Sequence, residues 1–189
     1  MEELFEGAPV VRVGSVAQWR AWLETNHDTV PSAWLVMVRG GEPGYEDAVC
    51  QALCFGWIDS VKKPRDDTST YQRFGPRRPG SSWVKSNRLR VERLVSSGEM
   101  TLAGQAVVDA AKASGAWDLL AEIEEGIVPD DVRLALDAVP EAATQFAAFP
   151  AGVRKLILTW IVSAKRPETR SARIVVTVEK AARGERAQG

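Results

Sequence analysis

Histidine is almost absent from this chain, which has one, His27, in 189 residues. A serine–histidine–aspartate triad is therefore not expected, and the two cysteines with that histidine supply too few ligands for a zinc centre. The chain also lacks a glycine-rich phosphate loop, a dinucleotide-binding fingerprint and a Gly-x-Ser-x-Gly nucleophile elbow. These absences argue against several familiar enzyme classes, and we expect no metal and no cofactor.

Long apolar runs and an export signal are also lacking. No stretch of about eighteen apolar residues is present, so no membrane-spanning helix is expected. The first ten residues, MEELFEGAPV, have neither the basic start nor the apolar core of a signal peptide. We therefore expect a cytoplasmic protein with no membrane partner.

Charge is distributed unevenly, although the formal net charge is only −1. A near-neutral total argues against a generally basic nucleic-acid-binding protein. Between Lys62 and Arg93, however, ten basic residues accompany three acidic ones, whereas residues 109–141 contain nine acids and two bases. This asymmetry marks the basic stretch as a candidate binding surface.

The spacing of apolar residues predicts an α+β fold, with a small N-terminal β-sheet and helices followed by a mostly helical C-terminal half. The predicted strands cover residues 10–13, 33–38, 57–61 and 70–74, and the last two form a hairpin. One predicted helix follows Ser15. The others cover residues 45–55, a stretch that begins between Ser82 and Asn87 and runs to Val95, and then residues 101–114, 130–136, 140–149, 151–165 and the chain from Pro167 onward. Gly126–Pro129 is the candidate boundary between an α+β part, residues 1–126, and a helical part, residues 127–189, which could also form one compact unit.

Two cysteines, Cys50 and Cys54, are four residues apart within the predicted helix at residues 45–55. This spacing places both on one face of the helix, in its apolar stripe. Free cysteine is among the most frequently buried residue types. We therefore interpret both as buried structural thiols.

The basic, aromatic-rich segment from Phe55 to Arg93 is the region most typical of a binding site. Each guanidinium presents five donors in a rigid fork that fits carboxylate and phosphate groups. Aromatic rings beside such cations can hold planar ligands, including unpaired nucleotides, and the start of the following helix favours anions. The predicted ligand-binding residues are Trp57, Asp59, Arg73, Arg77, Arg78, Trp83, Asn87 and Arg88.

Individual roles follow from the chemistry of these side chains. Arg73, Arg77 and Arg88 are predicted to bind an anion, against which Trp83 packs, while Asn87 fixes the orientation. The expected partner is an anionic small molecule or a single-stranded nucleic acid.

Two of the predicted residues would not bind the anion directly, and the whole segment also has a purely structural interpretation. Trp57 and Asp59 would shape the site, and Asp59 is the one weak candidate for acid–base catalysis. In the structural interpretation the aromatic rings form core, Asp59 is a structural partner, and the arginines are solvated or pair with residues 109–141.

Several ordered blocks resemble the YdeI/OmpD-associated, or bacteriocin-protection, family. They include Phe55-Gly56-Trp57-Ile58-Asp59, Gln72-Arg73-Phe74, Pro76-Arg77-Arg78, Ser82-Trp83, Asn87, Val91-Glu92-Arg93-Leu94, Ala103-Gly104, and, near the end, Pro167-Glu168-Thr169-Arg170 with Arg173-Ile174. The resemblance extends over about residues 15–184, although Gly75 and Val84 stand where the family pattern has a hydroxyl residue. It implies a bacterial protein linked to bacteriocin protection and envelope stress, and it implies no particular enzyme activity.

Three functional hypotheses remain open from the sequence. The leading one is a non-enzymatic binding or stress-protection protein with an anion-accepting basic surface. The second is an enzyme acting on an anionic small molecule, which requires Asp59 in a pocket within reach of several arginines. The third is a protein-interaction module that uses the opposed basic and acidic surfaces.

Overall fold

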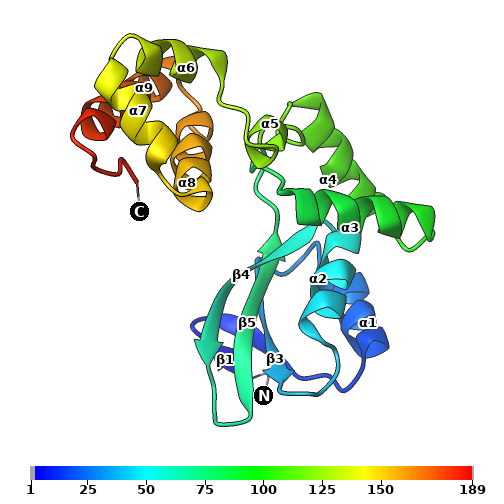
Figure 1. Cartoon of the computed structure of the whole chain (residues 1–189). Helices are drawn as coiled ribbons and strands as arrows, with labels where there is room; N and C mark the ends of the chain where they lie inside the picture. Colours follow the sequence, from blue (N-terminus) through cyan, green and yellow to red (C-terminus); the bar gives the residue numbers. More distant parts are fainter. Residues whose placement is uncertain (1–2, 189) are drawn as a thin grey trace. The chain divides into compact units, whose positions relative to one another are not determined.

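The computed structural model describes residues 3–188, which divide into two compact units. The first unit comprises the described residues up to Ser81 together with Ser86–Ser114, and the second comprises Ser82–Lys85 and the residues from Gly115 onward. The predicted α+β class is confirmed, with a sheet and helices in the first unit and helices in the second (Figure 1). The boundary predicted near residue 126 lies within the second unit.

A mixed sheet forms the centre of the first unit. Within the described residues its strands are β1 (Leu4–Phe5), β2 (Ala8–Val11), β3 (Ala33–Val38), β4 (Trp57–Pro64) and β5 (Ser69–Pro76). They lie in the order β1-β2-β3-β5-β4, with β2 parallel to β3 and the other neighbours antiparallel. The predicted hairpin is β4–β5, and each of its strands is longer than predicted.

The helices of the first unit begin and end at local signals in the sequence. They are α1 (Val16–Asn26), α2 (Tyr45–Cys54), α3 (Lys85–Ser96, whose first residue belongs to the second unit) and α4 (Leu102–Ala113). The side chain of Ser15 accepts a hydrogen bond from the backbone N–H of Gln18, and Thr101 caps α4 in the same way. Gly56, which follows α2, has a φ of 74°, a conformation that glycine adopts without strain.

Helix α4 lies close to the C-terminal end of α2 because Gly104 has no side chain. A Cβ atom at this position would lie 2.3 Å from the carbonyl oxygen of Cys54, far inside van der Waals contact. The hydroxyl of Thr101 donates a hydrogen bond to the same carbonyl. The two helices can therefore approach this closely only while residue 104 is glycine.

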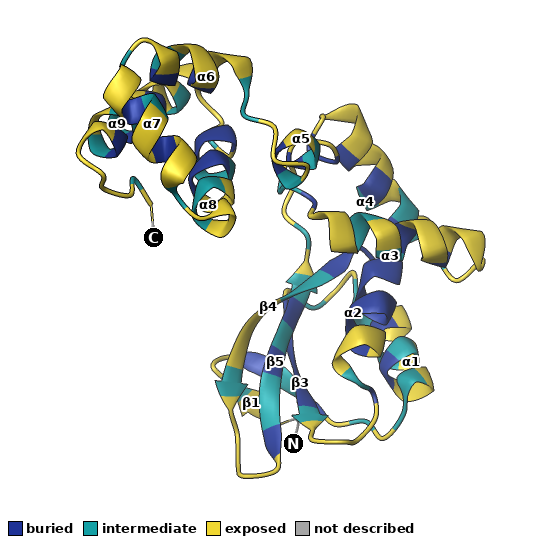
Figure 2. Ribbon diagram, in the orientation of Figure 1, coloured by how far each residue is buried: buried dark blue, intermediate teal, exposed yellow. Residues whose placement is uncertain are grey.

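Helices α1 and α2 pack on one face of the sheet, where the core includes the buried rings of Trp19, Trp57 and Phe74 (Figures 1 and 2). The ring of Trp19 lies 5.4 Å from that of Phe74 in β5. Alternate residues of a strand point to opposite faces. Trp34 and Arg73, which are paired across β3 and β5, therefore point to the face opposite Phe74.

The second unit is helical within the part of the chain that the structure describes. Its helices are α5 (Ala121–Glu124), α6 (Asp130–Asp137), α7 (Pro140–Ala148), α8 (Ala151–Val162) and α9 (Pro167–Ala182). Arg170 of α9 binds both carboxylate oxygens of Asp131 at 2.7 and 2.8 Å, which joins α9 to the start of α6. Among residues 3–188, no helix combines the length and apolarity that a membrane span requires.

Candidate anion-binding site

Three of the predicted arginines line a single hollow of about 570 Å³ in the first unit. Arg73 lies in β5 and Arg77 directly follows the end of this strand; both line the hollow, and Gly75 between them has no side chain to fill it. The arginine pocket, as we call this hollow, is lined by Arg73, Arg77, Arg78, Ser32, Ser60, Ser81 and neighbouring apolar residues.

Arg73 is held in position without a carboxylate partner among the described residues. Its guanidinium donates a hydrogen bond to Oγ of Ser32 at 2.9 Å and lies over the ring of Trp34, 5.7 Å from the centroid. A guanidinium has five N–H donors, and this arrangement uses one of them. Arg73 is therefore preorganised and retains donors for a ligand.

Arg77 is a cation held in a partly desolvated position. Burial lowers the pKa of Arg77 to about 10, although the negative charge of Asp59 opposes this effect. A pKa of about 10 still leaves the guanidinium charged near neutral pH. Because a desolvated charge is costly, an anion in the pocket would offset part of that cost.

The rim and walls of the pocket add further donors. Arg78 is exposed and makes no ion pair with the described residues. The hydroxyls of Ser32, Ser60 and Ser81 can also donate to an anion. No aspartate or glutamate of residues 3–188 is among the lining residues, so the pocket is positively charged.

Two aromatic residues predicted for the site lie in the protein core. Trp57 is 1% exposed, and its indole N–H donates to the carbonyl of His27 at 3.0 Å. Trp83 is 2% exposed, belongs to the second unit and packs against Trp117 with ring centroids 5.0 Å apart. Trp57 thus supports the sheet from within, and Trp83 does not line the arginine pocket.

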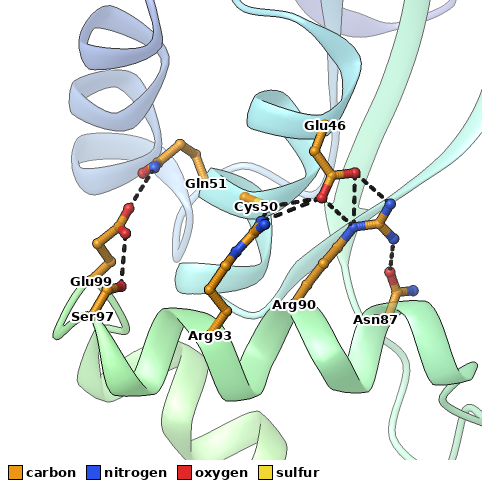
Figure 3. Close-up of polar contacts among 8 residues, drawn as sticks. All are labelled: Glu46, Cys50, Gln51, Asn87, Arg90, Arg93, Ser97 and Glu99. Carbon is orange, nitrogen blue, oxygen red and sulfur yellow. Dashed lines mark hydrogen bonds and ion pairs between the residues drawn. The ribbon is translucent and has the colours of Figure 1, made fainter.

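Asn87 belongs to a polar clasp between α2 and α3, defined by Glu46, Cys50, Asn87, Arg90 and Arg93 (Figure 3). Glu46 accepts hydrogen bonds from Arg90 at 2.6 to 3.1 Å and from Arg93 at 3.4 Å, and Arg90 donates to Asn87 at 2.7 Å. The hydrogen bonds from Arg90 lower the pKa of Glu46 to about 2. These arginines of the basic segment therefore hold two helices together.

The same clasp includes one of the two cysteines. Arg93 donates a hydrogen bond to the sulfur of Cys50 at 3.0 Å, and burial raises the pKa of that thiol. Both Cys50 and Cys54 are free and buried, as predicted. The remaining predicted residue, Arg88, lies on α3 and is not among the residues that line the arginine pocket.

Asp59 lines a different hollow from the arginines. Its Oδ2 accepts a hydrogen bond from the hydroxyl of Tyr45 at 2.8 Å. Lys62 and Gln72 line the same hollow, and no arginine among the described residues does so. The hypothesis of an enzyme requires Asp59 to share a pocket with several arginines, and this arrangement is not observed. The negative charge of Asp59 nevertheless acts on Arg77.

The predicted ligand-binding residues include none of the serines that line the arginine pocket. Ser32 directly precedes β3, and the pairing of Ala33 with Phe74 places it beside Gly75. The register of β3 on β5 would have identified Ser32, but a single sequence does not specify that register. Ser81 lies four residues after Arg77 in a loop, where no periodic pattern distinguishes it.

Two family models match the chain. Residues 11–107, just over half of the chain, match the domain of unknown function DUF8412, and the chain belongs to that family. Residues 125–184 match the family described as bacteriocin-protection, YdeI or OmpD-associated, which confirms the predicted resemblance for the C-terminal part. The blocks at residues 55–94 lie within the DUF8412 match. No curated protein and no solved structure matches the chain.

Proposed function

From the match of residues 125–184 to the bacteriocin-protection family and from the arginine pocket, we propose that the protein is a non-enzymatic, bacteriocin-protection-type protein that binds a small phosphate- or carboxylate-bearing anion. One observation carries the proposal: Arg73, Arg77 and Arg78 line one hollow, and no aspartate or glutamate of residues 3–188 is among its lining residues. A cytoplasmic role in bacterial stress protection forms part of the same proposal. Asp59 lines a different hollow, and the proposal gives it no catalytic role.

The dimensions and chemistry of the pocket favour a small anion. Its volume of about 570 Å³ lies within the usual range for small-molecule sites. Guanidinium groups can each donate two parallel hydrogen bonds to a carboxylate or phosphate, and serine hydroxyls can reach the remaining oxygens. Arg73 is already fixed by Ser32 and Trp34, so little side-chain entropy is lost when it binds a ligand.

A single-stranded nucleic acid is less favoured as the ligand. Binding of this kind combines a basic groove with aromatic rings on which bases stack. The two tryptophans predicted to serve beside the arginines, Trp57 and Trp83, are 1% and 2% exposed. The arginine pocket therefore offers the cations for such binding without these two stacking surfaces.

Isothermal titration calorimetry on the full chain tests the proposal. Pyrophosphate, citrate and a short oligouridylate serve as probes over a series of salt concentrations. We expect pyrophosphate or citrate to bind, and Arg73→Gln and Arg78→Gln each to weaken binding about tenfold or more, as loss of a hydrogen bond from a charged group does. Arg77→Lys keeps the charge but removes the fork, and should also weaken binding.

Arg12→Gln provides a matched control, because it removes the same charge from an exposed arginine that pairs with Glu3 and does not line the pocket. It should leave binding unchanged. Absence of binding by both small anions, or equal losses in Arg12→Gln and Arg73→Gln, would refute the proposal. Tight binding of the oligonucleotide alone, with a steep dependence on salt, would indicate a nucleic-acid ligand instead.

A further inference from the structure

A second recess lies between the sheet and the segment that leads into α2. It consists of two adjoining hollows of about 400 and 390 Å³. Both are lined by Met37, Tyr45, Lys62 and Thr70, so they are continuous at these residues. The recess shares only Ser60 with the arginine pocket among the lining residues, and is therefore a separate feature.

Asp59 and Lys62, which carry opposite charges, line the hollow of about 390 Å³ and form no ion pair with each other. The adjoining hollow is also lined by the exposed Arg39 and by Asp66, which pairs with Arg65 at 2.6 Å. Oδ2 of Asp59 accepts a hydrogen bond from Tyr45, whereas Oδ1 accepts none from the described residues. The ammonium group of Lys62 forms no ion pair with any described residue. A β-bulge between Asp59 and Lys62 interrupts the regular register of β4 on β5. A carboxylate and an ammonium group are thus both available to one ligand.

The polar wall around Asp59 is preorganised. Burial, together with the hydrogen bond to Asp59, raises the pKa of Tyr45 to about 12, so its phenol remains protonated and donates to the carboxylate near neutral pH. Gln72, which also lines the recess, is 4% exposed and donates to the carbonyl of Val61 at 3.4 Å. These contacts hold one side of the recess in place before a ligand arrives.

From these contacts we infer that the recess is a second binding site, which takes a small zwitterion of the α-amino-acid class. The ammonium group of the ligand binds Asp59, its carboxylate binds Lys62, and an apolar side chain packs against Met37. Opposite charges at separate positions in one recess match a molecule that carries both charges, and a purely anionic or purely cationic ligand would satisfy only one of them. This site is independent of the proposed anion binding.

Three related probes separate the two charge contacts. L-leucine carries both groups, N-acetyl-L-leucine lacks the ammonium group, and L-leucinamide lacks the carboxylate. Binding to the full chain is measured near neutral pH by ligand-observed NMR and by calorimetry. We expect leucine to bind, and each derivative to bind about tenfold more weakly or worse, because each loses a hydrogen bond between charged groups.

Substitutions then assign each contact to its residue. Asp59→Asn should weaken binding of leucine about tenfold and leave binding of N-acetyl-leucine unchanged. Lys62→Gln, at an exposed position, should weaken binding of leucine and leave binding of leucinamide unchanged. Arg73→Gln, in the other pocket, should leave leucine binding unaltered.

Specific results would overturn the inference. One is the failure of the folded wild-type chain to bind leucine. Another is equal binding of all three probes, and a third is an equal effect of Lys62→Gln on the binding of leucine and of leucinamide. Pyrophosphate binding measured on the same samples distinguishes this failure from failure of the proposed function, because only substitutions of Arg73, Arg77 and Arg78 should weaken it.

Discussion

Replacing Glu46 by glutamine would test whether the polar clasp between α2 and α3 stabilises the first unit. Glu46 accepts hydrogen bonds from Arg90 and Arg93, and these lower its pKa from the ordinary 4.5 to about 2. Glutamine has nearly the same shape but carries no charge, and it offers one acceptor oxygen instead of two. The substitution therefore removes the ionic part of the clasp with little change in packing.

The magnitude follows from the pKa and from the exposure of the side chain. A lowering of this size corresponds to an upper bound of roughly 3.4 kcal/mol in the free energy of unfolding. Glu46 is 50% exposed and Arg93 is 61% exposed, so solvent screens much of the interaction. Allowing for this screening, we expect Glu46→Gln to cost about 1 kcal/mol near neutral pH.

The sign of the pH dependence is fixed, because the pKa of Glu46 is lower in the folded protein than its ordinary value. The stabilisation is fully present above pH 4.5 and is lost as the pH falls through about 2. Urea unfolding of wild type and Glu46→Gln, followed by circular dichroism over this range, should show a difference that shrinks in acid.

Glu24→Gln provides the control, because Glu24 is exposed on α1 and its side chain forms no hydrogen bond or ion pair with the described residues. Its effect should stay within about 0.5 kcal/mol at every pH. A Glu46→Gln protein as stable as wild type near neutral pH, or a difference that does not change in acid, would refute the reasoning.

Two further predictions concern glycine positions in the two units and the titration of a tyrosine in the first unit. Gly104→Ala should lower the free energy of unfolding by about 3 kcal/mol, because the new Cβ would meet backbone atoms. Gly152→Ala, where a Cβ has nothing within 4 Å, should be neutral or stabilising by up to about 1 kcal/mol. Equal urea midpoints for the two variants would contradict this prediction. In a variant whose other tyrosine is phenylalanine, ultraviolet titration of Tyr45 should have its midpoint near pH 12, and Asp59→Asn should lower it. The stabilisation from the neutral phenol is present below pH 10 and lost as the pH rises through 12, and a midpoint unaffected by Asp59→Asn would contradict the contact.

The sequence predicts elements well where local signals and apolar spacing agree. Strand β3 has the predicted bounds, and α2 differs by one residue at its C-terminal end. Strand β1, at Leu4–Phe5, was not predicted because two residues cannot show a periodic pattern. Strand β4 continues through charged residues to Pro64. Its last residues show no apolar pattern, and pairing with β5 is what maintains the strand there.

The candidate site could be predicted only in part from the sequence. Arg73 and Arg77 were identified because guanidinium groups gathered on one segment indicate anion binding, and they do line one pocket. The chemistry of Trp83 and Asn87 also fits a ligand site in this segment, yet Trp83 is buried against Trp117 and Asn87 binds an arginine. Contacts between distant segments decide these roles, and spacing along the chain does not encode them.

A crystal structure of the protein with pyrophosphate tests the central claim most directly. The account predicts that the anion occupies the arginine pocket, with phosphate oxygens within hydrogen-bonding distance of the guanidinium groups of Arg73 and Arg77 and of the hydroxyl of Ser32. Pyrophosphate bound only at another basic position, such as Arg166, the residue that precedes α9, with the arginine pocket left empty, would contradict it.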